Sequence, residues 1–177
     1  GQRYDSAGNT TGSEFQINTY TDSSQDSPSV TSLTDGGFVV TWHSADDQDG
    51  DSYGIFGQRY DSSGNTTGSE FQINTNTFNN QLNPSVTGLN DGGFVVTWDS
   101  TGQDGGSQYS AGVFGQRYDS SGNTTGSEFQ INTYTDYHQG QPSVTSLTDG
   151  GFVVTWTSDG QDGDVNGIYG QRYDSSG

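Results

Sequence analysis

The sequence predicts an all-β protein built from tandem four-stranded antiparallel units that resemble the blades of a β-propeller. Three observations predict this class. The hexapeptide GQRYDS starts at residues 1, 57, 115 and 170, so a unit of about 56 residues recurs along the chain. Its apolar residues fall in short runs rich in Val, Phe, Trp and Tyr, which favour strands. No run has the 3.6-residue period of an amphipathic helix.

The repeat divides the chain into three complete units and a remainder. The units cover residues 1–56, 57–114 and 115–169, and residues 170–177 are the start of a fourth repeat or an overhanging strand. Because the chain also begins inside the recurring pattern, we expect it to be a segment of a longer array.

The strands of one unit can be assigned in order. Residues 30–33 are predicted to form the first strand, which leads into a Thr-Asp-Gly-Gly turn of the hairpin type. Residues 38–42, FVVTW, are apolar on both faces, as expected for a central strand that is covered on two sides. Residues 55–60 form the third strand, and residues 71–73 form the fourth after an Asp-Ser-Ser-Gly-Asn turn.

Two segments between the strands behave differently. The loop after the repeated Trp changes in length from unit to unit and covers residues 43–54, 99–112 and 157–167. Insertions are tolerated at exposed tips, so we expect this loop at an outer rim. In contrast, the segment at residues 19–27 keeps its length of nine in every unit while its sequence drifts. A fixed length is expected for a segment that crosses from one unit to the next.

Three units are too few to close a propeller, which typically has four to eight blades. A β-trefoil, which closes with three units, and another open β array are therefore alternatives. Units of an open stack cover one another's apolar surface, so the outer units are expected to associate end to end. The predicted partners are copies of the chain itself or neighbouring repeats.

The composition excludes several classes of function. Four basic residues stand against 22 acidic ones, which gives a formal charge of −18, and Cys is absent. A Cys-based metal site, a disulfide and a thiol nucleophile are therefore excluded. The charge opposes binding to nucleic acid, and no apolar run of about 18 residues is present that could insert into a membrane.

Calcium is the candidate cofactor, and the loop after the Trp is its candidate site. Calcium takes six to eight oxygen ligands, which closely spaced Asp residues with Gly at the turn can supply. The alternative is a solvated acidic loop that provides solubility. The second unit has fewer acids than the first and third. The predicted ligands are Asp46, Asp49, Asp51, Asp104, Asp159, Asp162 and Asp164.

Two further residue types recur at fixed positions. The arginines, at Arg3 and its equivalents in every unit, are expected to be structural, paired with the repeated Glu or Asp or stacked on the Trp. The alternative is one carboxylate- or sulfate-binding pocket per repeat. Trp42, Trp98 and Trp156 end an apolar strand, which favours the core over contact with a sugar.

Residues that break the repeat are the candidates for a site that exists once. Tyr20, Tyr134, Tyr137 and Phe78 lie in the drifting segments and are expected to form a contact surface that varies by repeat. The two His residues share no repeat position, and no Ser/His/Asp set or pair of Glu residues is indicated. We therefore expect no enzymatic activity, with a glycosidase-type propeller as the alternative.

The motifs DGGFVVTW, YGIFGQRYD and GSEFQINT resemble the tandem repeats of very large secreted bacterial surface proteins. Such proteins often also carry calcium-binding repeats of the RTX type, although the GGxGxD nonapeptide is absent here. The resemblance covers the whole chain and implies an extracellular or cell-surface location. It implies a structural repeat segment of an adhesin or matrix filament. The alternative function is a carbohydrate-binding, lectin-like module with one weak glycan site per repeat.

Overall fold

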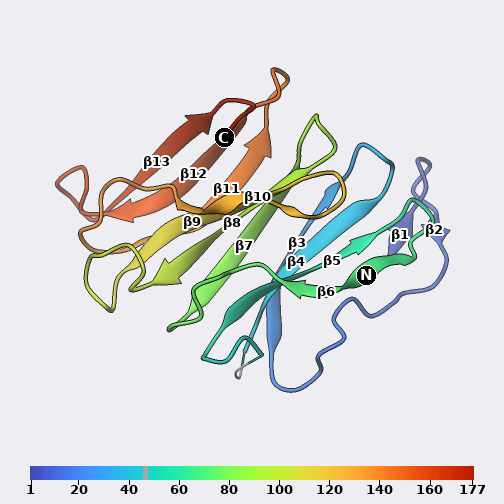
Figure 1. The fold of residues 1–177 in the computed structure, drawn as a ribbon, viewed down its shortest axis with the longest axis horizontal. Helices are drawn as coiled ribbons and strands as arrows, with labels where there is room; N and C mark the ends of the chain where they lie inside the picture. The colour runs from blue at the N-terminus through green and yellow to red at the C-terminus, as the bar shows by residue number, and fades with distance from the viewer. Residues whose placement is uncertain (46–47) are drawn as a thin grey trace.

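The computed structural model describes residues 1–45 and 48–177, and this part of the chain is all-β without a helix. The strands form one two-stranded sheet and three larger antiparallel sheets, and within each sheet every strand pairs with the next one in the sequence. Figure 1 shows the sheets following one another across the molecule in sequence order. No helix in the described ranges could cross a membrane.

We call the three sheets blades 1, 2 and 3, and the interface between adjacent blades a seam. Blade 1 contains β3 (Gln25–Ser32), β4 (Phe38–Ser44), β5 (Gly54–Tyr60) and β6 (Thr66–Gln72). Blade 2 contains β7 (Gln81–Gly88), β8 (Phe94–Thr101), β9 (Ala111–Tyr118) and β10 (Thr124–Gln130). Blade 3 contains β11 (Gln139–Ser146), β12 (Phe152–Asp159) and β13 (Asn166–Tyr173).

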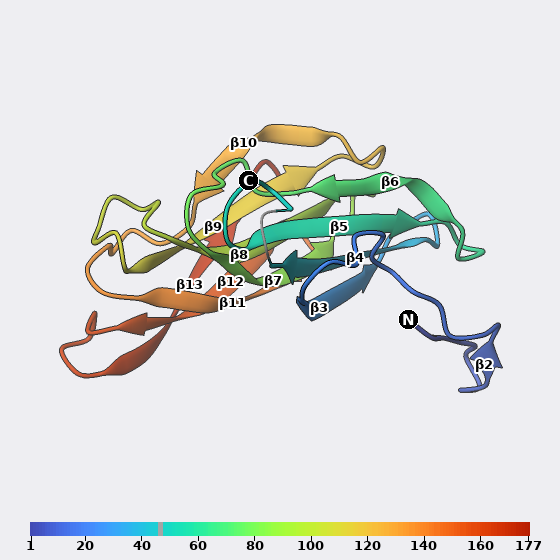
Figure 2. The ribbon, with the colours of Figure 1, turned by 90° about the horizontal axis from the view of Figure 1, so that it is seen from below.

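The blades are offset from the sequence repeats. Each blade begins 24 residues after a GQRYDS motif, so β3 starts at Gln25, β7 at Gln81 and β11 at Gln139. The residues before blade 1 form a separate pair, β1 (Arg3–Tyr4) and β2 (Thr10–Thr11), which projects at one end of the molecule (Figure 2). By repeat position, this pair corresponds to the end of the third strand and the start of the fourth in a blade.

The predicted strands at residues 38–42 and 55–60 are confirmed, and the other two are longer than predicted. The first strand starts at Gln25 rather than residue 30, and it contains a β-bulge between Asp26 and Ser29. The fourth strand begins at Thr66 and already ends at Gln72. Both extensions are polar, so apolar alternation could not reveal them.

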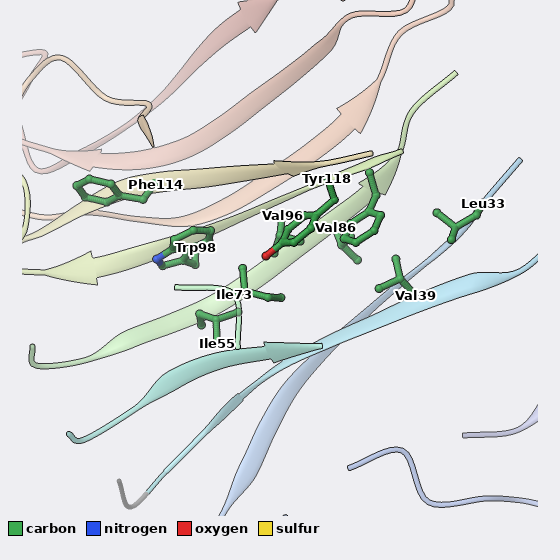
Figure 3. Close-up of a cluster of buried hydrophobic side chains, with 10 residues drawn as sticks. Leu33, Val39, Ile55, Ile73, Val86, Val96, Trp98, Phe114 and Tyr118 are labelled. Carbon is green, nitrogen blue, oxygen red and sulfur yellow. The ribbon is translucent and has the colours of Figure 1, made fainter. Parts of the chain in front are cut away.

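The apolar core lies in the seams. The central FVVTW strand has two buried faces, because Val39 packs toward blade 2 whereas Val40 and Trp42 pack toward the segment before blade 1. The three Trp residues are only 4%, 0% and 7% exposed, which confirms their predicted core role. Figure 3 shows the cluster of the first seam, which joins Leu33, Val39, Ile55 and Ile73 of blade 1 to Val86, Val96, Trp98, Phe114 and Tyr118 of blade 2.

An equivalent cluster fills the second seam. Val113 of blade 2 packs with Val144, Phe152 and Trp156 of blade 3. The blades therefore stack face to face as propeller blades do, and the trefoil alternative is wrong.

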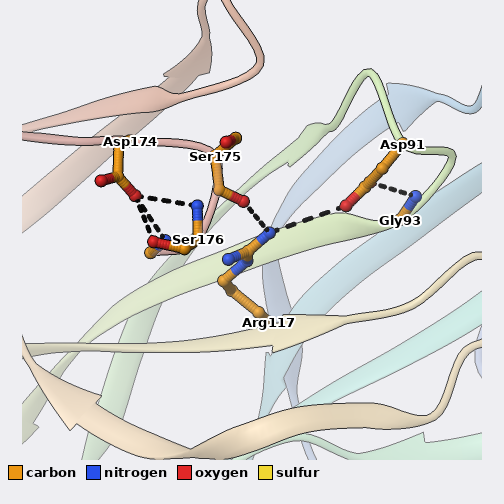
Figure 4. Close-up of polar contacts among 7 residues, drawn as sticks. Asp91, Gly93, Arg117, Asp174, Ser175 and Ser176 are labelled. Carbon is orange, nitrogen blue, oxygen red and sulfur yellow. Dashed lines mark hydrogen bonds and ion pairs between the residues drawn. The ribbon is translucent and has the colours of Figure 1, made fainter.

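Arg59 and Arg117 each bridge a seam to the next blade. Arg59 Nη2 donates to the carbonyl of Ser120 over 2.8 Å, and Arg117 Nη2 donates to the carbonyl of Ser175 over 3.1 Å. Arg117 also forms an ion pair with Asp91 at 3.6 Å (Figure 4). The predicted structural role agrees with this geometry, but the main partner is a backbone carbonyl rather than the repeated Glu.

The repeated Glu anchors the crossing segment instead. Glu128 Oε2 accepts hydrogen bonds from the amide and the hydroxyl of Thr75, at 2.7 and 3.0 Å. Glu70 makes the same two contacts with Thr19. The same anchor therefore fixes the crossing segments before blades 1 and 2, which explains why this segment keeps its length.

Candidate functional site

The variable loops and the crossing segments lie at the same rim of the blades. In each blade the loop after the Trp joins the second strand to the third, and the crossing segment leads into the first strand. Because neighbouring strands are antiparallel, these connections meet at one end of the sheet. A β-bridge between Tyr53 and Asn80 joins one such loop to a crossing segment directly.

An open pocket of about 570 Å³ lies at this rim between blades 2 and 3. Tyr109 and Tyr137 are its most exposed aromatic side chains, at 83% and 65%. We call it the rim pocket, and its lining is Ser107, Tyr109, Ser110, Thr135, Asp136, Tyr137, His138 and Asp159.

Tyr137 owes its position to the backbone on both sides of the pocket. Its own φ is 61°, in the left-handed region, and the equivalent residues Ser23 and Asn79 share this conformation at 56° and 60°. A Cβ on Gly160, whose φ is 72°, would lie only 3.0 Å from Cδ2 of Tyr137. The glycine therefore leaves room for the ring.

The surroundings of the pocket raise the pKa of a neighbouring phenol. Desolvation, followed by the negative charge of Asp136, raises the pKa of Tyr134, and Asp159 adds to this effect. A tyrosine hydroxyl is already protonated at neutral pH at its ordinary pKa of 10, so Tyr134 can donate a hydrogen bond there, and the shift extends this to higher pH.

The floor of the rim pocket connects to a buried carboxylate. His138 lies over Gly140, where an added Cβ would be 2.9 Å from its Nε2 and 3.5 Å from Cγ of Asp99. Asp99 is 3% exposed and accepts hydrogen bonds from Asn83 Nδ2 at 2.9 Å and from the amide of Gln141 at 3.2 Å. Burial raises the pKa of Asp99, while these hydrogen bonds and the nearby His138 oppose the shift.

His43 occupies the same repeat position as Asp99 and has the same structural role. Its Nδ1 faces the amide of Asn83 at 3.4 Å, and Tyr53 packs edge-on against its ring at 5.4 Å. Burial lowers the pKa of His43, so its ring is neutral at pH 7 and Nδ1 can accept this hydrogen bond. His43 therefore has a structural role, because it accepts a hydrogen bond across the first seam. His138, in contrast, lines the rim pocket.

Three of the predicted metal ligands pack against the start of the third strand. Asp49 lies against Gly54, and its Oδ2 accepts a hydrogen bond from Asn74 Nδ2 at 2.8 Å. Asp104 and Asp162 occupy the equivalent positions against Gly112 and Gly167. Each of these acids follows a Gln and precedes a Gly, so one motif recurs in loops of different length.

The remaining predicted ligands are dispersed. Asp51 accepts hydrogen bonds from the amides of Ser52 and Asn79, at 2.9 and 3.1 Å. Asp164 accepts one from the next amide in the chain, Asp159 lines the rim pocket, and Asp46 lies outside the described residues. Within residues 1–45 and 48–177, no three His, Asp or Glu side chains are grouped so that they could hold a metal ion. Calcium binding stays a prediction.

The sequence indicated part of the rim pocket. Tyr134 and Tyr137 were expected at a surface that varies by repeat, and the structure brings them together with Asp159. Tyr109 and Ser107 were not singled out. Their loop is the longest of the three, and that length was the signal that could have indicated them.

No protein-family model matches the sequence, and no curated protein matches it either. Solved structures do resemble the fold. A protein of unknown function from Dyadobacter fermentans DSM 18053 matches 86% of this chain with a TM-score of 0.63 and 14% identity. An endo-arabinase from Bacteroides thetaiotaomicron VPI-5482 matches 96% with a TM-score of 0.55 and 12% identity. An α-L-arabinofuranosidase from Lactobacillus brevis matches 95% with a TM-score of 0.52 and 16% identity.

These likenesses confirm the all-β, propeller-like blade fold. The chain spans 52%, 63% and 57% of the length of these three proteins, respectively. They also correct one expectation. The sequence led us to expect no enzymatic activity, but two of the three similar structures are named as glycoside-cleaving enzymes, so the fold is enzyme-related and that exclusion is wrong.

Proposed function

We propose that this chain binds carbohydrate in the rim pocket. The observation that carries the proposal is the exposure of the Tyr109 and Tyr137 rings in an open pocket that also holds Asp136 and Asp159. An aromatic ring packs against the apolar face of a sugar, while carboxylates accept hydrogen bonds from its hydroxyl groups. A pocket with both kinds of group is suited to a polyhydroxylated ligand.

The position of the pocket supports the same proposal. It lies where the repeats diverge, because Tyr137 replaces the Ser23 and Asn79 of the other two units. The residues of the pocket therefore differ from those at the equivalent positions of the other units, whereas the residues of the seams recur. The names of the similar enzymes make arabinose-containing polysaccharides the first ligands to test.

Calorimetric titration with arabinan oligosaccharides and a glycan array test this function. Tyr137→Ala is expected to weaken binding by about 2- to 12-fold, because an aromatic contact contributes roughly 0.5–1.5 kcal/mol. Phe78→Ala is the matched control, since Phe78 is an exposed aromatic residue, 58% accessible, in the crossing segment of the other seam. Absence of binding to any sugar, or equal loss in both variants, would contradict the proposal.

The same samples are assayed for new reducing ends, with Asp159→Asn as the variant expected to abolish any cleavage.

A structural role in an extracellular surface protein, such as an adhesin or matrix filament, is the second candidate function. It is favoured by the repetition of contacts between units, because the Arg–carbonyl pair recurs at both seams and the Glu–Thr pair recurs in the crossing segments before blades 1 and 2. Identical contacts between units are typical of arrays that extend by stacking. On intact cells that produce the protein, added protease is expected to degrade the chain. Protection until the cells are lysed would contradict this role.

A further inference from the structure

The outer face of blade 3 carries the residues that fill the inner seams. Ile55 of blade 1 and Val113 of blade 2 are fully buried at the third strand, each against the next blade. Ile168 occupies the same position in blade 3 and is 77% exposed. Within residues 1–45 and 48–177, no blade covers this face, which corresponds to one half of a seam.

The opposite end of the molecule carries the complementary half. Val86 and Val144 are 6% and 8% exposed, because each packs against the preceding blade, whereas the equivalent Val30 is 66% exposed. Beside Val30 lies a groove of about 940 Å³. Its apolar lining includes Phe38, Val40 and Trp42 of blade 1.

We propose that the outer face of blade 3 in one copy of the chain docks into this groove in a second copy. By repeat position, Leu147, Val153 and Ile168 would enter the groove as Leu33, Val39 and Ile55 enter the first seam. The occupant is argued from continuity with the two seams already present, since both faces are the unpaired halves of that same interface. The partner is therefore a second copy in a head-to-tail arrangement, which can extend further.

Polar contacts of the seam can be completed in the same way. At the first seam, the hydroxyl oxygens of Ser29 and Thr31 accept hydrogen bonds from the amides of Val86 and Gly88, at 3.2 and 3.1 Å. At the second seam, Ser85 and Thr87 repeat this pattern. Ser143 and Thr145 are the equivalent residues on the exposed face of blade 3, opposite the amides of Val30 and Ser32 in the second copy.

The arginine of blade 3 changes partner on docking. Arg172 is paired with Asp149 of its own blade, whereas Arg3 reaches the carbonyl oxygens of Ser62 and Ser63 across the groove. In the docked pair, Arg172 of one copy takes the place of Arg3 of the other.

This substitution is possible because two segments are nearly identical. Residues 170–177 read GQRYDSSG, and residues 1–8 read GQRYDSAG. Residues 170–177 of one copy can therefore displace residues 1–8 of the other and pair with β2 and the residues that follow it. Such an exchange of equivalent strands is a form of strand addition.

The test uses two variants that each block one face. Ile168→Asp places a charge on the blade 3 face, and Val30→Asp places one in the groove; both side chains are exposed in the single chain, so each variant should fold normally. Val165→Asp is the matched control, because Val165 is 70% exposed in the loop before β13 and belongs to no seam. Masses are measured by analytical ultracentrifugation over a concentration series at high sodium chloride, which screens the charge of −18.

The unaltered chain and Val165→Asp are expected to form oligomers whose mass grows with concentration. Ile168→Asp or Val30→Asp alone should remain a monomer, and a mixture of the two should give a 1:1 dimer and nothing larger, because one competent groove and one competent face remain. Monomeric unaltered chain, or a mixture that stays monomeric, would overturn the proposal. The inference deepens the structural candidate function and is independent of sugar binding, since none of the variants touches the rim pocket or changes the surface-exposure assay.

Discussion

Arg59 and Arg172 occupy the same repeat position but face different surroundings. Arg59 is 8% exposed and donates to a carbonyl of the next blade, whereas Arg172 lies on an outer face. A hydrogen bond from a charged donor contributes about 1.5–3 kcal/mol. Arg59→Ala is therefore expected to lower the free energy of unfolding by about that amount. Arg172→Ala should change it by less than about 0.5 kcal/mol. Urea unfolding of the two variants measures both, and equal losses would show that the seam contact contributes nothing.

Asp99 is expected to make the folded chain less stable as the pH rises, because its pKa is raised in the folded state. Burial raises its pKa in the folded state above the ordinary value of 3.8, so the folded chain holds this proton more tightly than the unfolded chain does. Asp99 therefore destabilises the fold increasingly as the pH rises from about 3.8 through the folded pKa. Asp99→Asn, which keeps an oxygen acceptor, should be more stable than the unaltered chain at pH 7 and equally stable near pH 3.

Asp61 is the control of opposite sign. Hydrogen bonds from Asn65 hold the pKa of Asp61 below 3.8, so its contribution is present at neutral pH and is lost as the pH falls through that lowered value. Asp61→Asn should therefore reduce stability at pH 7 and have less effect in acid. Urea titrations at both pH values separate the two cases. An Asp99→Asn variant that is weaker than the unaltered chain at pH 7 would contradict the assignment.

At the scale of elements, the sequence predicted the strands whose side chains are buried. It did not predict the strand segments that have mostly polar, exposed side chains. FVVTW predicted a central strand because both of its faces are apolar. In contrast, β6 begins with residues 66–70, TTGSE, whose side chains are mostly exposed, and of these only Thr66 and Thr67 pair in register with β5 before the register shifts. The rim pocket was predicted only in part for a related reason. Its residues come from two loops that lie side by side only in the folded chain. The sequence around Tyr109 does not show which other loop will be its neighbour.

The central strand of blade 2 is expected to be the most sensitive element. Trp98 is fully buried in the first seam, so Trp98→Ala should lower the free energy of unfolding by about 3–5 kcal/mol. Its indole Nε1 has no hydrogen-bond partner in the described part of the chain, so Trp98→Phe should cost clearly less. Urea unfolding measures both, with Tyr109→Ala as an exposed aromatic control. A cost for Trp98→Ala no larger than that of the control would contradict the core role.

The loops after the Trp carry the calcium prediction. Calcium chloride is expected to raise the melting temperature more than sodium chloride does at equal ionic strength, because a bound ion stabilises the folded chain and relieves repulsion among the acids. Asp51→Asn and Asp164→Asn should reduce the calcium-specific part of the increase, which differential scanning calorimetry can resolve. Equal increases with both salts would exclude the site.

At the scale of the whole molecule, stability is distributed unevenly because blade 2 has two seams and blade 3 has one. β8 is buried along almost its whole length, whereas residues of β12 alternate between buried and accessible. Stacked units are stabilised chiefly by their neighbours. Amide hydrogen exchange, followed by mass spectrometry, is therefore expected to be slowest in β8 and faster in β12 and β13. Uniform protection across the three blades would show that the chain opens only as one unit.

The contacts at the seams also bear on how the gene that encodes such a chain can change. Every contact joins one repeat to the next, and the residues that make it, Arg to Ser carbonyl and Glu to Thr, are the same at each step. Unequal recombination between two copies of the repeat removes or adds one whole unit, and the new neighbours meet through residues that already fit. Meanwhile, substitutions at the rim alter what the surface contacts without touching a seam. The number of repeats and the residues of the rim can thus change independently.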